Sequence, residues 1–125
     1  MFQQPGSFLI AETKTRIVEP GITVVEISGR LTLGNALQSL ENSVRRLIEE
    51  GSRKLIFDLA GLTSIDSAGL GMLVGTNGIM EQSGGQVRIA GAQGTVAKSF
   101  DVVHLDRVIA LDPDCDTACG KLSGA

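Results

Sequence analysis

The stretch DLAGLTSIDSAGLG, residues 58–71, connects an apolar strand to a glycine-rich helix through a polar loop. Residues 55–57 (Leu, Ile, Phe) precede it as a continuous apolar run, which is typical of a strand covered on both faces. The apolar residues from 68 to 80 predict a helix, and Asp66 can cap it by accepting hydrogen bonds from free amides in its first turn. The pattern therefore predicts a strand, a loop and a helix in direct succession.

Ser67 follows the predicted cap, so its hydroxyl lies on the first turn of this helix. That position is at the positive end of the helix dipole, beside the crevice at a strand's carboxyl end. A phosphate on such a hydroxyl would be well placed electrostatically. Ser67 is therefore the candidate site of modification.

The same helix contains four glycines, although each interior glycine lowers helix stability by roughly 0.8–1 kcal/mol relative to alanine. They are Gly69, Gly71, Gly75 and Gly78. We therefore expect some of these positions to require close backbone approach. The approach is either to the sheet beneath the helix or to a partner above it.

The segment from Asp66 to Gly71, DSAGLG, resembles the signature of the STAS domain family, the anti-sigma factor antagonists (anti-anti-sigma factors) of bacteria. Residues 29–36, GRLTLGNA, resemble the family's earlier Gly-Glu-Leu-Asp loop. Where many members have Glu and Asp in that loop, this chain has Arg30 and Thr32. The resemblance in element order and spacing extends from about residue 14 to residue 122.

The resemblance implies a protein–protein switch at Ser67. In the family, an anti-sigma factor that is itself a serine kinase phosphorylates the matching serine, and a separate serine phosphatase removes the phosphate. The unphosphorylated form binds the anti-sigma factor and thereby releases a sigma factor. The residues implied to bind the partner are Thr32, Leu33, Asp66, Ser67, Ala68, Gly69, Leu70 and Gly71, with Thr32 also a candidate second acceptor. A non-switching subunit of a stress-signalling or lipid-transport complex is the alternative.

Two enzymatic interpretations fit the residues less well. The glycines at 69, 71 and 75 nearly match a dinucleotide-binding fingerprint, but the third is one place late and no acidic residue ends the next predicted strand. Residues 65–69, IDSAG, differ from the Gly-x-Ser-x-Gly nucleophile elbow, and His104 is the sole histidine. We therefore expect neither enzymatic activity nor a cofactor or metal.

The composition indicates one globular domain in a chain of 125 residues, with 42% hydrophobic and 20% charged residues. An aromatic content of 3% and a net charge of -3 argue against direct nucleic-acid binding. The chain has no apolar run of the roughly 20 residues that span a bilayer, and its first residues lack the basic region of a secretory signal. We expect a cytoplasmic protein without membrane insertion; the oligomeric state stays open.

Strand and helix patterns alternate along the chain and predict an α/β fold. We expect a single STAS-like domain with a mixed, mostly parallel sheet, an antiparallel N-terminal strand and about four helices. Its boundaries are an N-terminal extension at 1–13, the domain at 14–122 and a tail at 123–125. The expected strands are 14–19 and 22–28 (a hairpin around Pro20 and Gly21), 54–58, 86–90 and 108–111; the expected helices are 35–50 (capped by Asn35), 67–82, 95–103 and one that begins at Asp112.

Two cysteines, Cys115 and Cys119, lie four residues apart in the last predicted helix. A single closely spaced pair does not indicate a disulfide framework, and two ligands do not complete a zinc site. Helical phase places Cys119 inward with Ala118 and Leu122, and Cys115 near the exposed helix start. Ordinary packing is the expectation for both.

Overall fold

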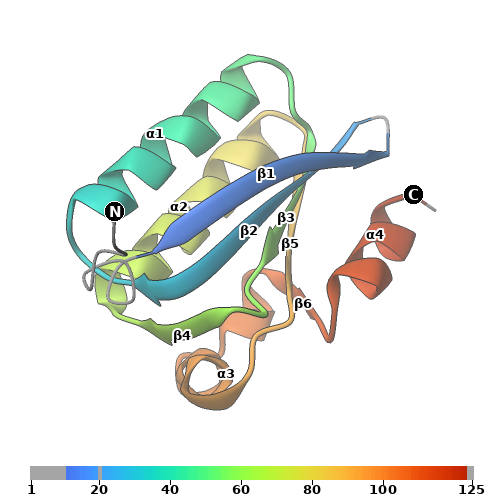
Figure 1. Cartoon of the computed structure of the whole chain (residues 1–125). Helices are drawn as coiled ribbons and strands as arrows, with labels where there is room; N and C mark the ends of the chain where they lie inside the picture. Colours follow the sequence, from blue (N-terminus) through green and yellow to red (C-terminus); the bar gives the residue numbers. More distant parts are fainter. Residues whose placement is uncertain (1–10, 20, 124–125) are drawn as a thin grey trace, which may run out of the picture.

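A computed structural model describes residues 11–19 and 21–123 of the chain (Figure 1). A mixed sheet forms its centre, and the helices lie on both of its faces. The elements in order are β1 (Glu12–Glu19), β2 (Ile22–Leu31), α1 (Asn35–Glu49), β3 (Lys54–Asp58), β4 (Leu62–Ile65), α2 (Ser67–Gln82), β5 (Gln86–Ala90), α3 (Gly94–Val102), a 3-10 turn (Leu105–Arg107), β6 (Ala110–Asp112) and α4 (Cys115–Ser123).

The sheet has the strand order β1-β2-β3-β5-β6, and β4 pairs with the far end of β2. The β1–β2 pair is antiparallel, whereas all other pairs are parallel. Val25 shows the register, since it pairs with Thr15 on one side and with Phe57 on the other. The predicted α/β fold with an antiparallel first strand and four helices is thereby confirmed.

Each face of the sheet has its own apolar core. The larger core lies beneath α1 and α2 and includes Leu55 and Phe57 of β3. The smaller core lies beneath α4 and includes Ile56 of the same strand. Because neighbouring side chains of β3 are buried on opposite faces, the expectation of a strand covered on both sides is confirmed.

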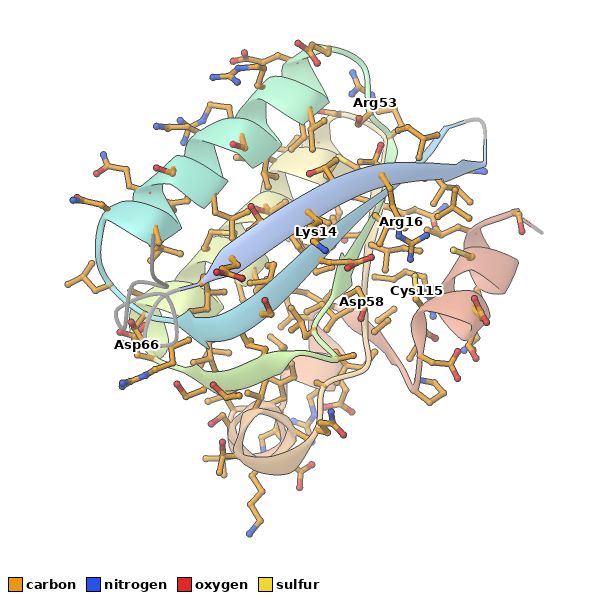
Figure 2. All side chains as sticks on the ribbon, viewed as in Figure 1. Lys14, Arg16, Arg53, Asp58, Asp66 and Cys115 are labelled. Atoms are coloured by element: carbon orange, nitrogen blue, oxygen red, sulfur yellow. The ribbon has the colours of Figure 1, made fainter. Side chains whose placement is uncertain are left out.

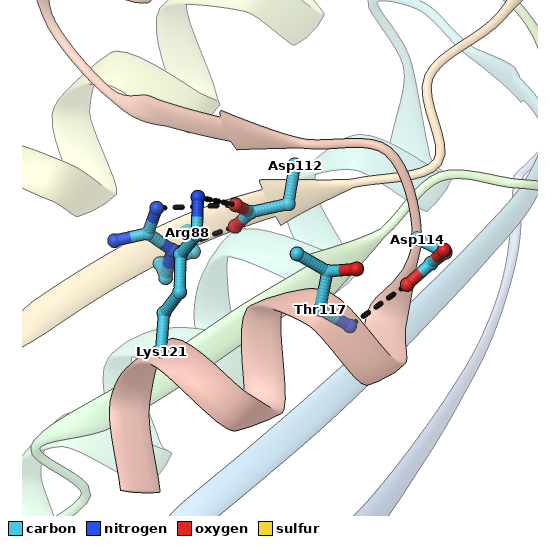
Figure 3. A network of polar contacts seen from close by, with 5 residues as sticks. All are labelled: Arg88, Asp112, Asp114, Thr117 and Lys121. Carbon is cyan, nitrogen blue, oxygen red and sulfur yellow. Dashed lines mark hydrogen bonds and ion pairs between the residues drawn. The ribbon is translucent and has the colours of Figure 1, made fainter. Parts of the chain in front are cut away.

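Three charged side chains fasten α4 to the edge of the sheet (Figure 3). The guanidinium of Arg88 on β5 donates two hydrogen bonds to the Asp112 carboxylate, at 2.6 and 3.1 Å, and Lys121 of α4 lies 3.1 Å from it. The side chain of Asp112 is fully buried. Burial raises the pKa of Asp112, but the hydrogen bonds from Arg88 and Lys121 outweigh it and hold the pKa below its usual value.

The strand β4 is a difference from the sequence analysis, which expected residues 62–65 to be part of a polar loop. These residues pair in parallel with the end of β2, which continues to Leu31 instead of ending at 28. Thr63 reinforces the pairing, because its hydroxyl donates a 2.9 Å hydrogen bond to the carbonyl of Gly29. A strand of four residues is too short for its period-2 pattern to be recognised from sequence.

The helix starts also differ from expectation. Gly34, with φ 155°, occupies the cap position of α1, and Asn35 is the first residue of the helix instead of its cap. The last helix begins at Cys115 because Asp112 belongs to β6 and Asp114 serves as the cap, accepting a 2.7 Å bond from the Thr117 amide.

The other boundaries shift by one or two residues. The 3-10 turn after α3 includes a 2.9 Å hydrogen bond from the Val108 amide to Leu105, so β6 begins at Ala110 instead of 108. The first strand begins at Glu12 instead of 14. The predicted turn residue Pro20 and residues 1–10 and 124–125 of the predicted extension and tail lie outside the described residues. Within residues 11–19 and 21–123, no helix has the length and apolar character to cross a membrane.

Candidate functional site

Asp66 joins two segments that lie far apart in the sequence. One carboxylate oxygen accepts a 2.9 Å hydrogen bond from the Gly69 amide in the first turn of α2, which confirms the predicted cap. The other accepts a 2.9 Å bond from the Leu33 amide in the loop between β2 and α1. These backbone donors, Leu33 first and then Gly69, lower the pKa of Asp66, so the side chain stays ionised near neutral pH.

The backbone strengthens the same connection. The Asp66 amide donates to the carbonyl of Leu31 at the end of β2, at 3.2 Å, and the Leu70 amide donates to the Asp66 carbonyl at 3.0 Å. The loop that follows Leu31 is therefore held beside the first turn of α2. Figure 2 shows Asp66 at this end of the sheet.

The side chains around this connection differ in exposure. Ser67 is the first residue of α2 and is exposed, as is Gly71 one turn later. Leu33 is 81% exposed, which is unusual for a leucine. Thr32, Asp66, Ala68 and Leu70 are half-buried. The structure thus places a free hydroxyl, a carboxylate and an exposed leucine at one end of the sheet.

Gly69, one of the residues expected to bind the partner, does not share this exposure. It is buried, and a Cβ atom added there would clash with the carbonyl oxygen of Leu31 and lie 2.7 Å from Cγ1 of Ile65. The close approach that this glycine allows is therefore to the sheet. Gly71 is the opposite case, because no described atom lies within 4 Å of a Cβ added at that position.

A third segment adds apolar surface that the sequence analysis missed. Val102 and Val103 at the end of α3 are 78% and 51% exposed. With Leu70 of α2 they line a mainly apolar hollow of about 300 Å³, and we call these three residues the α3 shelf. The sequence analysis placed Val103 inside a helix at 95–103, but α3 (Gly94–Val102) ends one residue earlier.

Arg30 and His104 occupy separate places in the fold. Arg30 lies opposite Ser64 in the β2–β4 pair, and its side chain donates a 3.2 Å hydrogen bond to the Ser64 hydroxyl. His104 is exposed in the turn after α3, where it adopts a left-handed conformation with φ 55°. Its amide donates a 3.1 Å hydrogen bond to the carbonyl of Asp101, and its carbonyl accepts a 3.1 Å bond from the Arg107 amide, so its backbone links the end of α3 to the 3-10 turn.

The Asp66 cap also supports the stability of the fold. We expect Asp66→Ala to lower the free energy of unfolding by about 1–2 kcal/mol, because the amides of Gly69 and Leu33 both lose their acceptor. Asp66→Asn retains one side-chain oxygen as an acceptor and should lose less. Urea denaturation of both variants at pH 7 measures the difference, and equal loss in the two would contradict the two-acceptor explanation.

Comparison with known proteins relates this geometry to a family. A model described as the STAS domain matches residues 13–118. The chain is similar to an anti-sigma factor antagonist from Mycobacterium paratuberculosis, with 22% identity, a TM-score of 0.78 and coverage of 96% of this chain and 97% of that one. It is similar to the Bacillus cell fate determinant SpoIIAA in its phosphorylated form, with 20% identity, a TM-score of 0.72 and coverage of 89% and 99%. The murine anion transporter Slc26a9 shares the fold over 94% of this chain and 23% of its own, with 17% identity and a TM-score of 0.68.

Proposed function

Because this chain belongs to the STAS domain family, we propose that it is an anti-sigma factor antagonist of the bacterial cytoplasm, with Ser67 as its switch. Its unphosphorylated form binds an anti-sigma factor that is a serine kinase, and a sigma factor is released. Phosphorylation of Ser67 by that kinase ends the binding, and a serine phosphatase restores it. The observation that carries the proposal is the exposed Ser67 hydroxyl, fixed on a capped helix start among exposed apolar side chains.

The docking surface consists of the Leu33 loop, the first turn of α2 and the α3 shelf. Exposed apolar side chains that gather around one point of a surface are characteristic of protein–protein contacts. Leu33 and Val102 are each more than three-quarters exposed, so a partner that covers them removes a large apolar area from water. The residues of α2 that contribute exposed or half-buried atoms are Ser67, Ala68, Leu70 and Gly71.

Electrostatics explain how one phosphate would end the binding. A phosphoserine carries about -1.5 to -2 charges at neutral pH. At position 67 these charges would be next to the Asp66 carboxylate, whose low pKa keeps it ionised. The helix dipole tolerates this charge in water, but a docked partner would have to remove its hydration. The phosphorylated form therefore binds weakly without a change of fold.

The chain contributes the acceptor hydroxyl and a recognition surface, and the partner contributes the phosphoryl-transfer chemistry. This division explains why the site has no need of a catalytic base beside Ser67. The phosphorylated form of Bacillus SpoIIAA supports an acceptor role for a protein of this fold. We accordingly assign no enzymatic activity to the chain itself.

The test is the affinity of Ser67 variants for the anti-sigma factor encoded by the same genome, measured by isothermal titration calorimetry. Ser67→Ala should bind within about twofold of the wild type, because it removes only a hydroxyl. Ser67→Asp should bind more than about tenfold more weakly, a loss above about 1.4 kcal/mol. Ser43→Asp, on the exposed face of α1, is the matched control for added charge. Equal affinities for Ser67→Ala and Ser67→Asp would contradict the switch.

A second candidate function is a non-switching interaction subunit in a stress-signalling or lipid-transport complex. The similarity to a domain-sized part of an anion transporter favours it, since such a domain works within a larger assembly. The same titration separates the two functions. If Leu33→Asp abolishes binding while Ser67→Asp does not, the surface is used but not switched. An added phosphate of about 80 Da at Ser67, found by mass mapping of the native protein, favours the switch.

A further inference from the structure

A hollow of about 480 Å³ lies between α3, the 3-10 turn and the ends of β5 and β6. It shares only Lys98 with the hollow of the α3 shelf, so it is distinct from the proposed docking surface. Binding sites for small organic molecules have volumes of about 300–1,000 Å³. We propose that this hollow binds a small zwitterion with an apolar body, which is the chemistry of a free α-amino acid with an apolar side chain.

Apolar side chains form the floor of the hollow. Ile89 of β5 and Phe100 of α3 are at most 2% exposed and close it from below. Leu111 of β6 pairs with Ile89 but is 36% exposed, and the neighbouring Ala92 and Ala97 are half-buried. The fold thus leaves apolar surface in contact with water, and a ligand with an apolar body gains free energy by covering it.

The local geometry of the chain keeps the hollow open. The strand β6 has only three residues and lies at the end of the sheet, where it pairs with β5. The helix α3 ends at Val102, and the 3-10 turn follows before the chain reaches β6. Ala92 and Ala97 line the hollow with small side chains. A larger side chain at position 97 would therefore occupy the space that the ligand needs.

Charged side chains line the same hollow. Lys98 and Asp101 come from α3 and Asp106 comes from the 3-10 turn; all three are exposed. Among the residues that the structure describes, none of these three forms an ion pair. Asp112 also lines the hollow, but its carboxylate already binds two cationic side chains. One ammonium group and two carboxylates therefore remain for a ligand.

These charges fit both ends of an amino-acid zwitterion. Its ammonium group can donate hydrogen bonds to Asp101 and Asp106, and its carboxylate can accept one from Lys98. A ligand with only a positive charge would be repelled by Lys98, and a ligand with only a negative charge would be repelled by both aspartates. The zwitterion is thus the ligand that gives each free charge a partner, while its side chain covers Leu111.

The experiment is a titration of the full chain with L-leucine, followed by ¹H–¹⁵N NMR. We expect saturable shifts at the amides of the residues that line the hollow, with a Kd of about 0.1–1 mM. Three analogues test the three parts of the ligand: 3-methylbutylamine lacks the carboxylate, 4-methylpentanoate lacks the ammonium group, and L-serine lacks the apolar side chain. Each analogue should bind at least about tenfold more weakly than leucine.

Variants of the lining test the same assignment. Ala97→Leu fills the hollow and should abolish binding. Asp101→Asn and Asp106→Asn should each weaken binding by about five- to tenfold, because each removes a charged acceptor for the ammonium group. Lys98→Gln should weaken it by about threefold. Glu49→Gln, on the exposed face of α1, is the control for loss of a charge and should bind leucine like the wild type.

Three results would overturn the proposal: no shift at the lining residues up to about 10 mM leucine, unchanged affinity in either aspartate variant, or an analogue that binds as tightly as leucine. Thermal melts identify any variant that fails to fold. The aspartate variants decide the question if Ala97→Leu is unfolded, because both aspartates are exposed. Ser67→Ala should bind leucine normally, so this result is independent of the switch.

Discussion

Replacing Gly69 by alanine is expected to destabilise the fold by about 2–3 kcal/mol. The reason is the backbone of β2: the new methyl group would clash with the Leu31 carbonyl oxygen and lie 2.7 Å from Ile65. Neither is the movable end of a long side chain, so the helix or the sheet must shift. The urea midpoint, at unchanged m-value, measures this loss.

Gly71→Ala is the matched control, because the same substitution two residues later meets empty space. Alanine is the better helix former by about 0.8–1 kcal/mol, so this variant should be more stable than the wild type. The two variants together should differ by roughly 3 kcal/mol. If both were stabilised equally, the contact between Gly69 and the sheet would not limit packing.

Asp112→Ala is the second large effect, with an expected loss of about 3 kcal/mol. The Asp112 side chain is fully buried, and that of Arg88 is 18% exposed. Removal of the carboxylate leaves the guanidinium of Arg88 without its partner and releases Lys121 of α4. Asp101→Asn, at an exposed position of α3, is the control and should change stability by less than about 0.5 kcal/mol.

The same network predicts how stability depends on pH. The pKa of Asp112 in the folded state lies below its unfolded value of about 3.9. The ionised Asp112 carboxylate therefore contributes fully to the free energy of unfolding above about pH 4. This contribution is lost as the pH falls through the pKa that Asp112 has in the folded state. Urea denaturation at pH 7 and at pH 3 measures this effect. Between these two pH values, the free energy of unfolding should decrease less in Asp112→Ala than in the wild type. Parallel losses in the two proteins would contradict this assignment.

Local sequence patterns predicted the features of this molecule that depend on interactions between residues close together in the sequence. Asp66 was identified as a cap because a capping bond joins residues three apart, and the helix stripe of α1 follows from its 3.6-residue period. The bond from Leu33 to Asp66 spans 33 residues, and no periodicity reports it. The sequence therefore predicted that α2 begins at Ser67 but not what holds the loop beside it.

Two details of the structure could not be predicted from local sequence patterns. The glycine pattern of α2 indicated close approach, but it could not say that Gly69 faces the sheet and Gly71 faces solvent. Val103 was placed inside the predicted helix 95–103, although it lies just beyond the last turn of α3. Such errors occur where an element ends or where two faces have similar composition, because only tertiary packing distinguishes them.

The proposed docking surface combines residues from three separate segments, which meet only in the folded chain. Leu33 belongs to a loop, Ser67 to a helix start, and Val102 with Val103 to the end of another helix. None of the three apolar residues named here belongs to either core. Substitutions at these three residues can therefore change the character of this surface while both cores, and with them the fold, stay the same.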